Sequence, residues 1–132
     1  MSKGTIVKNS LLKDGVTSSV KIYDKIANST ISEGTATIQL SENQSIYKIT
    51  PTADFTVSID TSKLSIPENS AITFYLLVDE SEATDAWQMT NADDFKWGNT
   101  SPTMTAMVKY LFAFSSFDGG QTWVANQMYS WE

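Results

Sequence analysis

The chain of 132 residues contains no cysteine, no histidine and no arginine. Without cysteine, neither a disulfide framework nor a thiolate metal site can form. Without histidine, the chain lacks the commonest general base and the commonest metal ligand. Ser-His-Asp and Cys-His nucleophilic catalysis are therefore excluded, and only carboxylate, lysine, tyrosine or hydroxyl chemistry remains. We predict that the protein is not an enzyme and name no catalytic residue, no cofactor and no metal site.

Positive charge is scarce as well. Nine lysines face 15 acidic residues, which gives a net charge of −6. Nucleic-acid binding is driven by clustered Lys and Arg, so nucleic acid is not an expected partner. No segment approaches the roughly 20 apolar residues that a membrane span requires, and no hydrophobic signal segment follows Met1. We expect a soluble protein with neither membrane insertion nor export by a visible signal.

Hydroxyl side chains are abundant, since serine and threonine supply 33 of the 132 residues. Threonine suits strands and serine suits turns, so this enrichment favours an all-β fold. The length fits one domain with a core that needs no disulfide or metal. Alternation of apolar and polar residues predicts strands at residues 5–8, 20–26, 35–40, 45–50, 54–60, 71–78, 108–114 and 122–129.

Turn signals separate these strands at short intervals, and Asp118-Gly119-Gly120 predicts a hairpin turn between the last two. About eight or nine short strands with such spacing are typical of an antiparallel β-sandwich or jelly-roll-like single domain. Residues 80–92 lack a helical apolar stripe, so we interpret them as a loop with one helical turn at most.

The stretch Ala71–Trp131 holds most of the apolar surface. Its first strand is apolar on both faces, with Tyr75 and Leu77 on one face and Ile72, Phe74, Leu76 and Val78 on the other. Such a strand is expected at the centre of a sheet, with both sides covered by a second sheet or by a neighbouring subunit.

An acidic set lies between the two most apolar strands, at Asp79, Glu80, Glu82, Asp85, Asp93 and Asp94. Hard oxygen ligands suit Ca²⁺, but this spacing matches no known calcium loop, and we prefer a solvated acidic loop. A glycoside hydrolase would need two carboxylates about 5–9 Å apart across a sugar cleft. No motif in the sequence identifies such a pair of carboxylates, so a glycoside hydrolase has no specific support.

Aromatic residues crowd the last third of the chain. Trp87, Trp97, Tyr110 and Trp123 are our candidates for contact with a glycan or with another subunit. Exposed rings of this kind could stack on sugars, as in a carbohydrate-binding module that uses Trp87, Trp97 and Tyr110. The rings could equally fill the core or anchor an interface, where aromatic side chains dominate the energetics, and we prefer this interpretation.

Three motifs carry a resemblance to a known family. They are Phe95-Lys96-Trp97-Gly98, Ser101-Pro102-Thr103-Met104-Thr105 and Phe117-Asp118-Gly119-Gly120-Gln121-Thr122-Trp123. In this order, after an alternating strand and a long apolar strand, they resemble the C-terminal β-domain of phage virion proteins such as tail fibres, head fibres and related small structural proteins. The resemblance covers roughly residues 45–130.

This resemblance implies a homo-oligomer, a trimer, with the β-domain at the tip and the N-terminus toward the particle. Only about 45 residues precede the resembling region, which favours a head fibre or capsid decoration protein over a long tail fibre. We divide the chain into an N-terminal attachment segment (residues 1–35, a strand or hairpin) that docks on capsid or tail proteins and a β-sandwich domain (residues 36–132). The expected location is the virion, assembled in the host cytoplasm, with weak contact to a host surface glycan. The alternatives are a short tail-fibre or receptor-binding protein and a carbohydrate-binding module.

Overall fold

A computed structural model describes residues 23–92, 95–98 and 102–132. The described residues form ten strands and no helix: β1 (Ile26–Asn28), β2 (Ile31–Ser32), β3 (Thr35–Gln39), β4 (Ile46–Ile49), β5 (Phe55–Asp60), β6 (Ile72–Asp79), β7 (Met89–Asn91), β8 (Phe95–Trp97), β9 (Lys109–Ser116) and β10 (Trp123–Trp131). The all-β prediction is confirmed. The strand predicted at residues 5–8 and residues 20–22 of the strand predicted at 20–26 lie outside the described residues, and of residues 23–26 only Ile26 is in a strand, β1.

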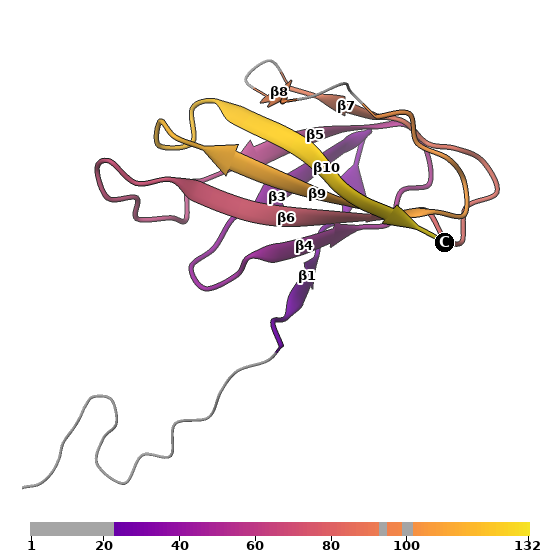
Figure 1. Cartoon of the computed structure of the whole chain (residues 1–132), viewed down its shortest axis with the longest axis horizontal. Coiled ribbons are helices and arrows are strands. Elements are labelled where there is room, and N and C mark those ends of the chain that lie inside the picture. The colour runs from indigo at the N-terminus through magenta and orange to yellow at the C-terminus, as the bar shows by residue number, and fades with distance from the viewer. Residues whose placement is uncertain (1–22, 93–94, 99–101) are drawn as a thin grey trace, which may run out of the picture.

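The strands form two sheets that pack face to face. The six-stranded sheet has the order β1-β4-β6-β9-β10-β8, and the four-stranded sheet has the order β2-β3-β5-β7. In Figure 1, β6, β9 and β10 lie in front of β3 and β5, and the C-terminus lies at the same end of the molecule as the end of β6. The sandwich itself therefore agrees with the prediction.

The strand directions do not agree with it. Five of the eight pairings among the described residues are parallel: β1 with β4, β4 with β6, β8 with β10, β3 with β5 and β5 with β7. From β3 to β8 every connection crosses to the other sheet, so neighbours within one sheet run the same way. The expected antiparallel sandwich is therefore wrong in strand direction, and the jelly-roll order, which is antiparallel, is not found among these pairings.

The core fills the space between the two sheets. Phe114 stacks on Phe74 at 4.9 Å between ring centroids, and the edge of Phe95 meets Phe114 at 4.8 Å. The ring of Trp123 packs edge-on against Phe74 at 5.3 Å and is fully buried. Offset-stacked and edge-to-face pairs of this kind add roughly 0.5–1.5 kcal/mol each to simple area burial. The aromatic cluster thus ties β6, β8, β9 and β10 into one core.

Strand β6 is central, between β4 and β9, as predicted. Its inward side chains Phe74, Leu76 and Val78 are at most 1% exposed. Its outward face is not covered by the described residues, since Tyr75 is 38% exposed. The second sheet covers the inward face of β6, and no described part of the chain covers its outward face.

The two connections that the sequence singled out have different outcomes. The hairpin turn at Asp118-Gly119-Gly120 is confirmed, with positive φ at both glycines and the Asp118 carboxylate accepting bonds from the backbone N–H groups of Gln121 and Thr122. These bonds hold the pKa of Asp118 below its ordinary value. Residues 80–92 contain no helical turn; instead Met89–Asn91 pairs with β5 as β7, because Met89 is buried against the core.

Candidate functional site

The four aromatic candidates do not share one surface. Trp123 is fully buried and Tyr110 is 4% exposed, so both belong to the core of the chain. Trp97 is half-buried and packs inward, with its ring 5.2 Å from Phe95 and 5.5 Å from Phe112. Trp87 is the one of the four that lines a surface hollow among the described residues. The stacking surface expected from Trp87, Trp97 and Tyr110 together is therefore not assembled, because Tyr110 points into the core.

Part of the outward face of the six-stranded sheet is apolar, although Asn28 and Lys48 share one of its rows and Asp79 and Lys109 share another. The strand registers place Ile26, Ile46, Tyr75 and Ala113 in one row across the sheet, and Leu77, Leu111 and Tyr129 in the next. We call these residues, with Trp131 in the row beyond, the apolar face. Ile26 is 50% exposed, Tyr129 is 63% exposed and Trp131 is 43% exposed. With a strand spacing of ~4.8 Å and a row spacing of ~6.8 Å, each outward residue covers ~33 Å², so these eight residues cover roughly 260 Å² in projection.

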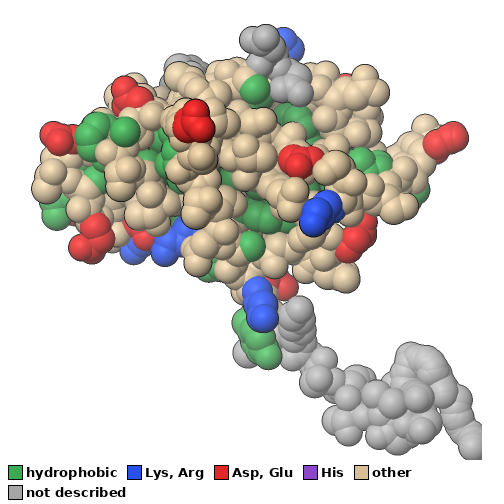
Figure 2. Space-filling model, turned by 180° about the vertical axis from the view of Figure 1, so that it is seen from behind, with side chains coloured by type: hydrophobic (Ala, Val, Ile, Leu, Met, Phe, Trp, Pro, Cys, Tyr) green, Lys and Arg blue, Asp and Glu red, His purple; other side chains and the backbone are tan. Residues whose placement is uncertain are grey.

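The outward face of the four-stranded sheet has the opposite character. Its side chains are Thr35, Thr37, Gln39, Thr56, Ser58, Asp60 and Thr90, which we call the hydroxyl face. Cross-strand bonds join Thr56 to Thr90 at 2.8 Å and Gln39 to Asp60 at 3.2 Å. Figure 2, seen from behind, shows a surface that is mostly neither apolar nor charged. The contrast between the two faces indicates that only the apolar face is suited to burial.

A buried carboxylate organises the loop after β6. Glu80 is 1% exposed, and its Oε1 accepts a 3.0 Å bond from the backbone N–H of Trp87. Its carbonyl accepts bonds from the N–H groups of Ala83 and Met107, and its own N–H donates to Val108. Its Oε2 has no hydrogen-bond partner. Burial raises the pKa of Glu80, an effect that the Trp87 bond opposes and the nearby charge of Asp54 reinforces.

The hollow that Trp87 lines lies where β4 and β6 end. It has a volume of about 250 Å³, and its walls include Thr50, Thr52, Thr84, Asp79 and Glu82. A second hollow of about 310 Å³ shares Thr50 and Thr52 with it and continues along Lys48 to Asn28 and Ser29. Lys48, which lines the second hollow, lies 3.4 Å from the carboxylate of Asp79, which lines the first. We call the combined depression the Trp87 groove.

The Asp79 side chain in this groove is an ionised carboxylate. Burial alone would raise the pKa of Asp79, but hydrogen bonds from Ser81 and the adjacent Lys48 outweigh it, so the pKa lies below its ordinary value. Asp79 and Glu80 therefore differ in kind although they are adjacent. The solvated acidic loop expected from the sequence holds for Glu82 and Asp85, which are exposed, and is wrong for Asp79 and Glu80, which are buried.

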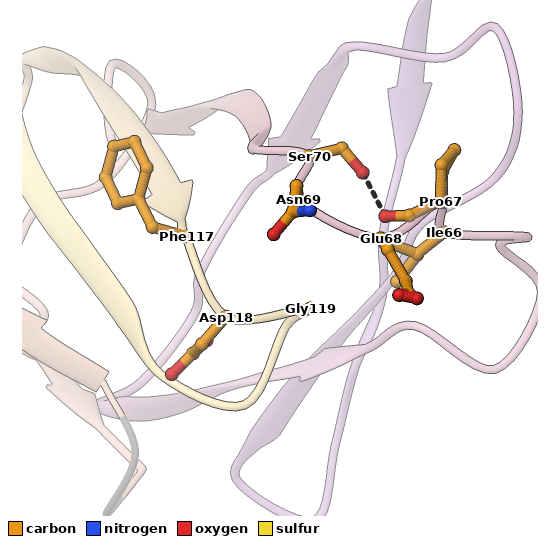
Figure 3. A pocket seen from close by; sticks show the side chains of 8 residues that line it. All are labelled: Ile66, Pro67, Glu68, Asn69, Ser70, Phe117, Asp118 and Gly119. Carbon is orange, nitrogen blue, oxygen red and sulfur yellow. Dashed lines mark hydrogen bonds between the residues drawn. The ribbon is translucent and has the colours of Figure 1, made fainter.

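A larger hollow of about 430 Å³ lies at the opposite end, between residues 66–70 and the β9–β10 hairpin (Figure 3). Its carboxylates come from Glu68 and Asp118, and the ring of Phe117 beside it is 77% exposed. However, the Asp118 Oδ1 atom is already occupied by the bonds of the hairpin turn. Few polar groups are left to converge on a ligand here, so this hollow is the weaker candidate.

Two further site classes can be tested on the described residues. No group of three or more Asp, Glu, His or Cys side chains among them lies close enough to hold a metal ion, while Asp93 and Asp94 of the acidic set fall outside the described residues. Glu80 has the raised pKa typical of a general acid, but its burial keeps it from contact with a substrate.

Among the described residues no helix is long and apolar enough to cross a membrane.

Comparisons with family models, curated proteins and solved structures found no match to this chain.

Sequence reasoning found Trp87 but missed its setting. Glu80 was expected in a solvated acidic loop because charged residues in loops are usually exposed, and no pattern in the sequence marks Thr50 or Thr52. The signal that could have found the groove is the position of both segments at the same ends of β4 and β6, which pair in parallel.

Proposed function

We propose that this chain is a non-enzymatic structural component of a phage virion, a head fibre or capsid decoration protein that assembles as a homotrimer and projects from the particle. The resemblance of its motifs to virion β-domains suggests the particle. The apolar face supports the assembly, and it is the single observation on which the proposal rests. Monomers rarely expose apolar patches beyond a few hundred Å², and patches of that size often mark interaction sites.

A second copy of the chain is the occupant that fits this face best. The projected area of roughly 260 Å² is about a third of the ~800 Å² of accessible surface that each partner buries in a standard interface, so this face would form the apolar centre of such a contact. The face carries Tyr75, Tyr129 and Trp131, and aromatic residues of this kind are enriched at the centres of interfaces. The face is also bordered by Lys48 and Asp79, which supply the polar rim typical of such contacts.

Residues 1–35 are proposed as the attachment segment toward capsid or tail proteins. β1 lies at the edge of the six-stranded sheet, and Tyr23 just before it is 75% exposed. A chain that enters the domain at a sheet edge can reach a neighbouring surface without disturbing the core. Since β1 and β2 pair within the two sheets, docking would use the part of this segment that precedes Ile26.

Two measurements test the proposal. Light scattering of the purified chain at micromolar concentration should give three times the 14.6 kDa mass of one chain. Immunogold labelling of purified phage particles with an antibody to the chain should place it on the head or the tail. A stable monomer would contradict the assembly, and particles without label would contradict the virion location.

A short tail-fibre or receptor-binding protein is the second candidate, and a carbohydrate-binding module is related to it. One observation favours this class: Trp87 lies half-buried beside a surface hollow instead of within the core. Loss of host adsorption by particles that lack the chain would favour receptor binding over decoration.

A further inference from the structure

We propose that the Trp87 groove is a binding site for a neutral oligosaccharide, with the Trp87 ring as the stacking surface. This inference adds a ligand site to the chain and does not depend on the virion role or on the oligomeric state. The sequence predicted a stacking surface made of Trp87, Trp97 and Tyr110. The proposed site instead contains one aromatic ring, that of Trp87, and a set of polar groups on neighbouring segments.

The position of Trp87 is fixed before any ligand arrives. Its backbone N–H donates to Glu80, whose main chain is in turn held by Ala83, Met107 and Val108. The next residue, Gln88, is held in the same way by Asp54, at 2.9 Å from its backbone N–H. No ring pairing between Trp87 and another described aromatic residue occupies the indole. Because the backbone of Trp87 is held, only its two side-chain torsions remain to be ordered when a ligand stacks on the partly exposed ring.

Polar groups of both kinds converge on the hollow. The hydroxyls of Thr50, Thr52 and Thr84 form no hydrogen bond with another described residue, so they can donate to or accept from a ligand. The carboxylates of Asp79 and Glu82 can only accept when ionised. Sugar hydroxyls donate and accept, and the faces of a pyranose ring are apolar. One aromatic wall with a few convergent polar groups is the general pattern of a small-ligand site.

The charge of the groove limits the ligand class. Two carboxylates, Asp79 and Glu82, face one lysine, Lys48, whose charge is already paired with Asp79. An anionic sugar such as a uronate would meet repulsion from the unpaired Glu82, whereas a neutral sugar would not. The second hollow, which continues from Thr50 and Thr52 to Asn28, gives room beyond a single ring and favours an oligosaccharide over a monosaccharide.

Nuclear magnetic resonance of the full chain tests this directly, because each of the four tryptophans gives one indole N–H signal. The probes are maltohexaose, cellohexaose, isomaltohexaose and chitohexaose, with hexagalacturonate as the acidic comparison. At least one neutral probe should shift the Trp87 signal saturably, with a dissociation constant of roughly 1 mM or below. The buried Trp123 signal should stay in place, and hexagalacturonate should have no effect.

Variants separate binding from folding. Trp87→Ala should abolish the saturable shift seen elsewhere in the groove, and Trp131→Ala on the apolar face should leave it unchanged. Since Trp87→Ala could loosen the loop, Thr52→Val serves as a second variant: Thr52 is exposed, so the fold should persist while affinity falls by about threefold or more. The proposal is overturned if no neutral probe shifts Trp87 at ~10 mM, if Thr52→Val and Trp87→Ala bind like the parent, or if hexagalacturonate binds as well as the neutral probes.

Discussion

At the scale of single residues, Glu80 and Asp79 show how position decides what a carboxylate does. Asp79 points outward, receives bonds from Ser81 and pairs with Lys48, so its ionised form is stabilised. Glu80 points inward, with one oxygen bonded to the Trp87 N–H and the other without a partner. An unpaired buried oxygen makes ionisation costly. The loop that carries Trp87 is thus anchored by the Glu80 carboxyl group, whose ionised form is disfavoured by burial.

Glu80→Gln should change how stability depends on pH. The folded-state pKa of Glu80 is raised above its ordinary value of 4.5, so the folded state binds more protons between these two values and the free energy of unfolding falls as pH rises through that window. Gln keeps an oxygen for the Trp87 N–H and cannot ionise, so this decline should disappear. Urea denaturation at a series of pH values between about 4 and neutrality measures this change in slope.

Glu82→Gln is the matched control for loss of one negative charge, since Glu82 is exposed in the same loop. It should leave the slope of stability against pH as in the parent chain. Equal slopes for Glu80→Gln and the parent would show that Glu80 does not carry the effect.

Single-residue roles were the part of the molecule least accessible from sequence. Alternation correctly separated the inward Phe74 and Leu76 from the outward Tyr75 and Leu77. It could not tell that Tyr110 and Trp123 lie in the core while Trp87 lies at a hollow, because all three are aromatic residues in apolar or mixed surroundings. That distinction depends on which segments meet in space.

At the scale of elements, the β9–β10 hairpin is the best-defined local structure. Gly119 and Gly120 have φ of +75° and +88°, and the Asp118 carboxylate binds the backbone on the far side of the turn. Gly120 also lies against another element. A Cβ there would fall 2.9 Å from Cγ2 of Thr61, which follows β5, whereas a Cβ at Gly119 would meet nothing within 4 Å. The turn therefore packs against the connection between β5 and β6.

Gly120→Ala should be more destabilising than Gly119→Ala. Both substitutions force an L-residue into a left-handed conformation, at about 1–2 kcal/mol each. Gly120→Ala adds a clash with the Thr61 methyl group, worth roughly 1–3 kcal/mol if the neighbour cannot move. Thr61→Ser removes that methyl group, so the double variant Gly120→Ala/Thr61→Ser should return to the stability of Gly119→Ala in chemical denaturation. Equal stability of the two alanine variants in the Thr61 background would contradict the contact.

Strand positions were predictable, and strand partners were not. The clearest predicted strands, at 35–40, 45–50, 54–60 and 71–78, match β3 to β6 within a residue or two. Their parallel pairing was missed because alternation is the same in parallel and antiparallel strands. Parallel neighbours are usually joined by a helix, whereas here a strand of the opposite sheet makes the crossover. β7 and β8 have three residues each, too few for alternation to identify them.

At the scale of the whole molecule, the two outer faces differ in polarity. The hydroxyl face bonds to itself across strands and offers water a polar surface. The apolar face offers rings and aliphatic chains with no covering from the described residues. The Trp87 groove lies apart from the centres of both faces, at the end where β4 and β6 finish. Because Lys48 and Asp79 belong both to the groove and to the border of the apolar face, an assembly through that face would bring a second copy close to the groove.

Leu111→Lys on the apolar face should lower the mass measured by light scattering to that of one chain, because burying an unpaired ammonium in an interface is costly. Leu111 faces outward between the buried Tyr110 and Phe112, so the core should be unaffected. Thr37→Lys on the hydroxyl face is the matched control and should keep the mass of the parent. Far-ultraviolet circular dichroism of both variants verifies that the sandwich is retained. An unchanged mass for Leu111→Lys would exclude this face from the contact.

The place of β10 between β9 and β8 also governs when the molecule can fold during synthesis. The four-stranded sheet has all its strands once translation passes Asn91, but Phe112, Phe114 and Trp123, which cover its inner side, come later. β8 must wait longer still, since its only pairing among the described residues is with β10. We expect nascent chains to display the four-stranded sheet only partly covered, by β4 and β6, until residue 131 has left the ribosome, which makes release of β10 the moment at which the sandwich closes.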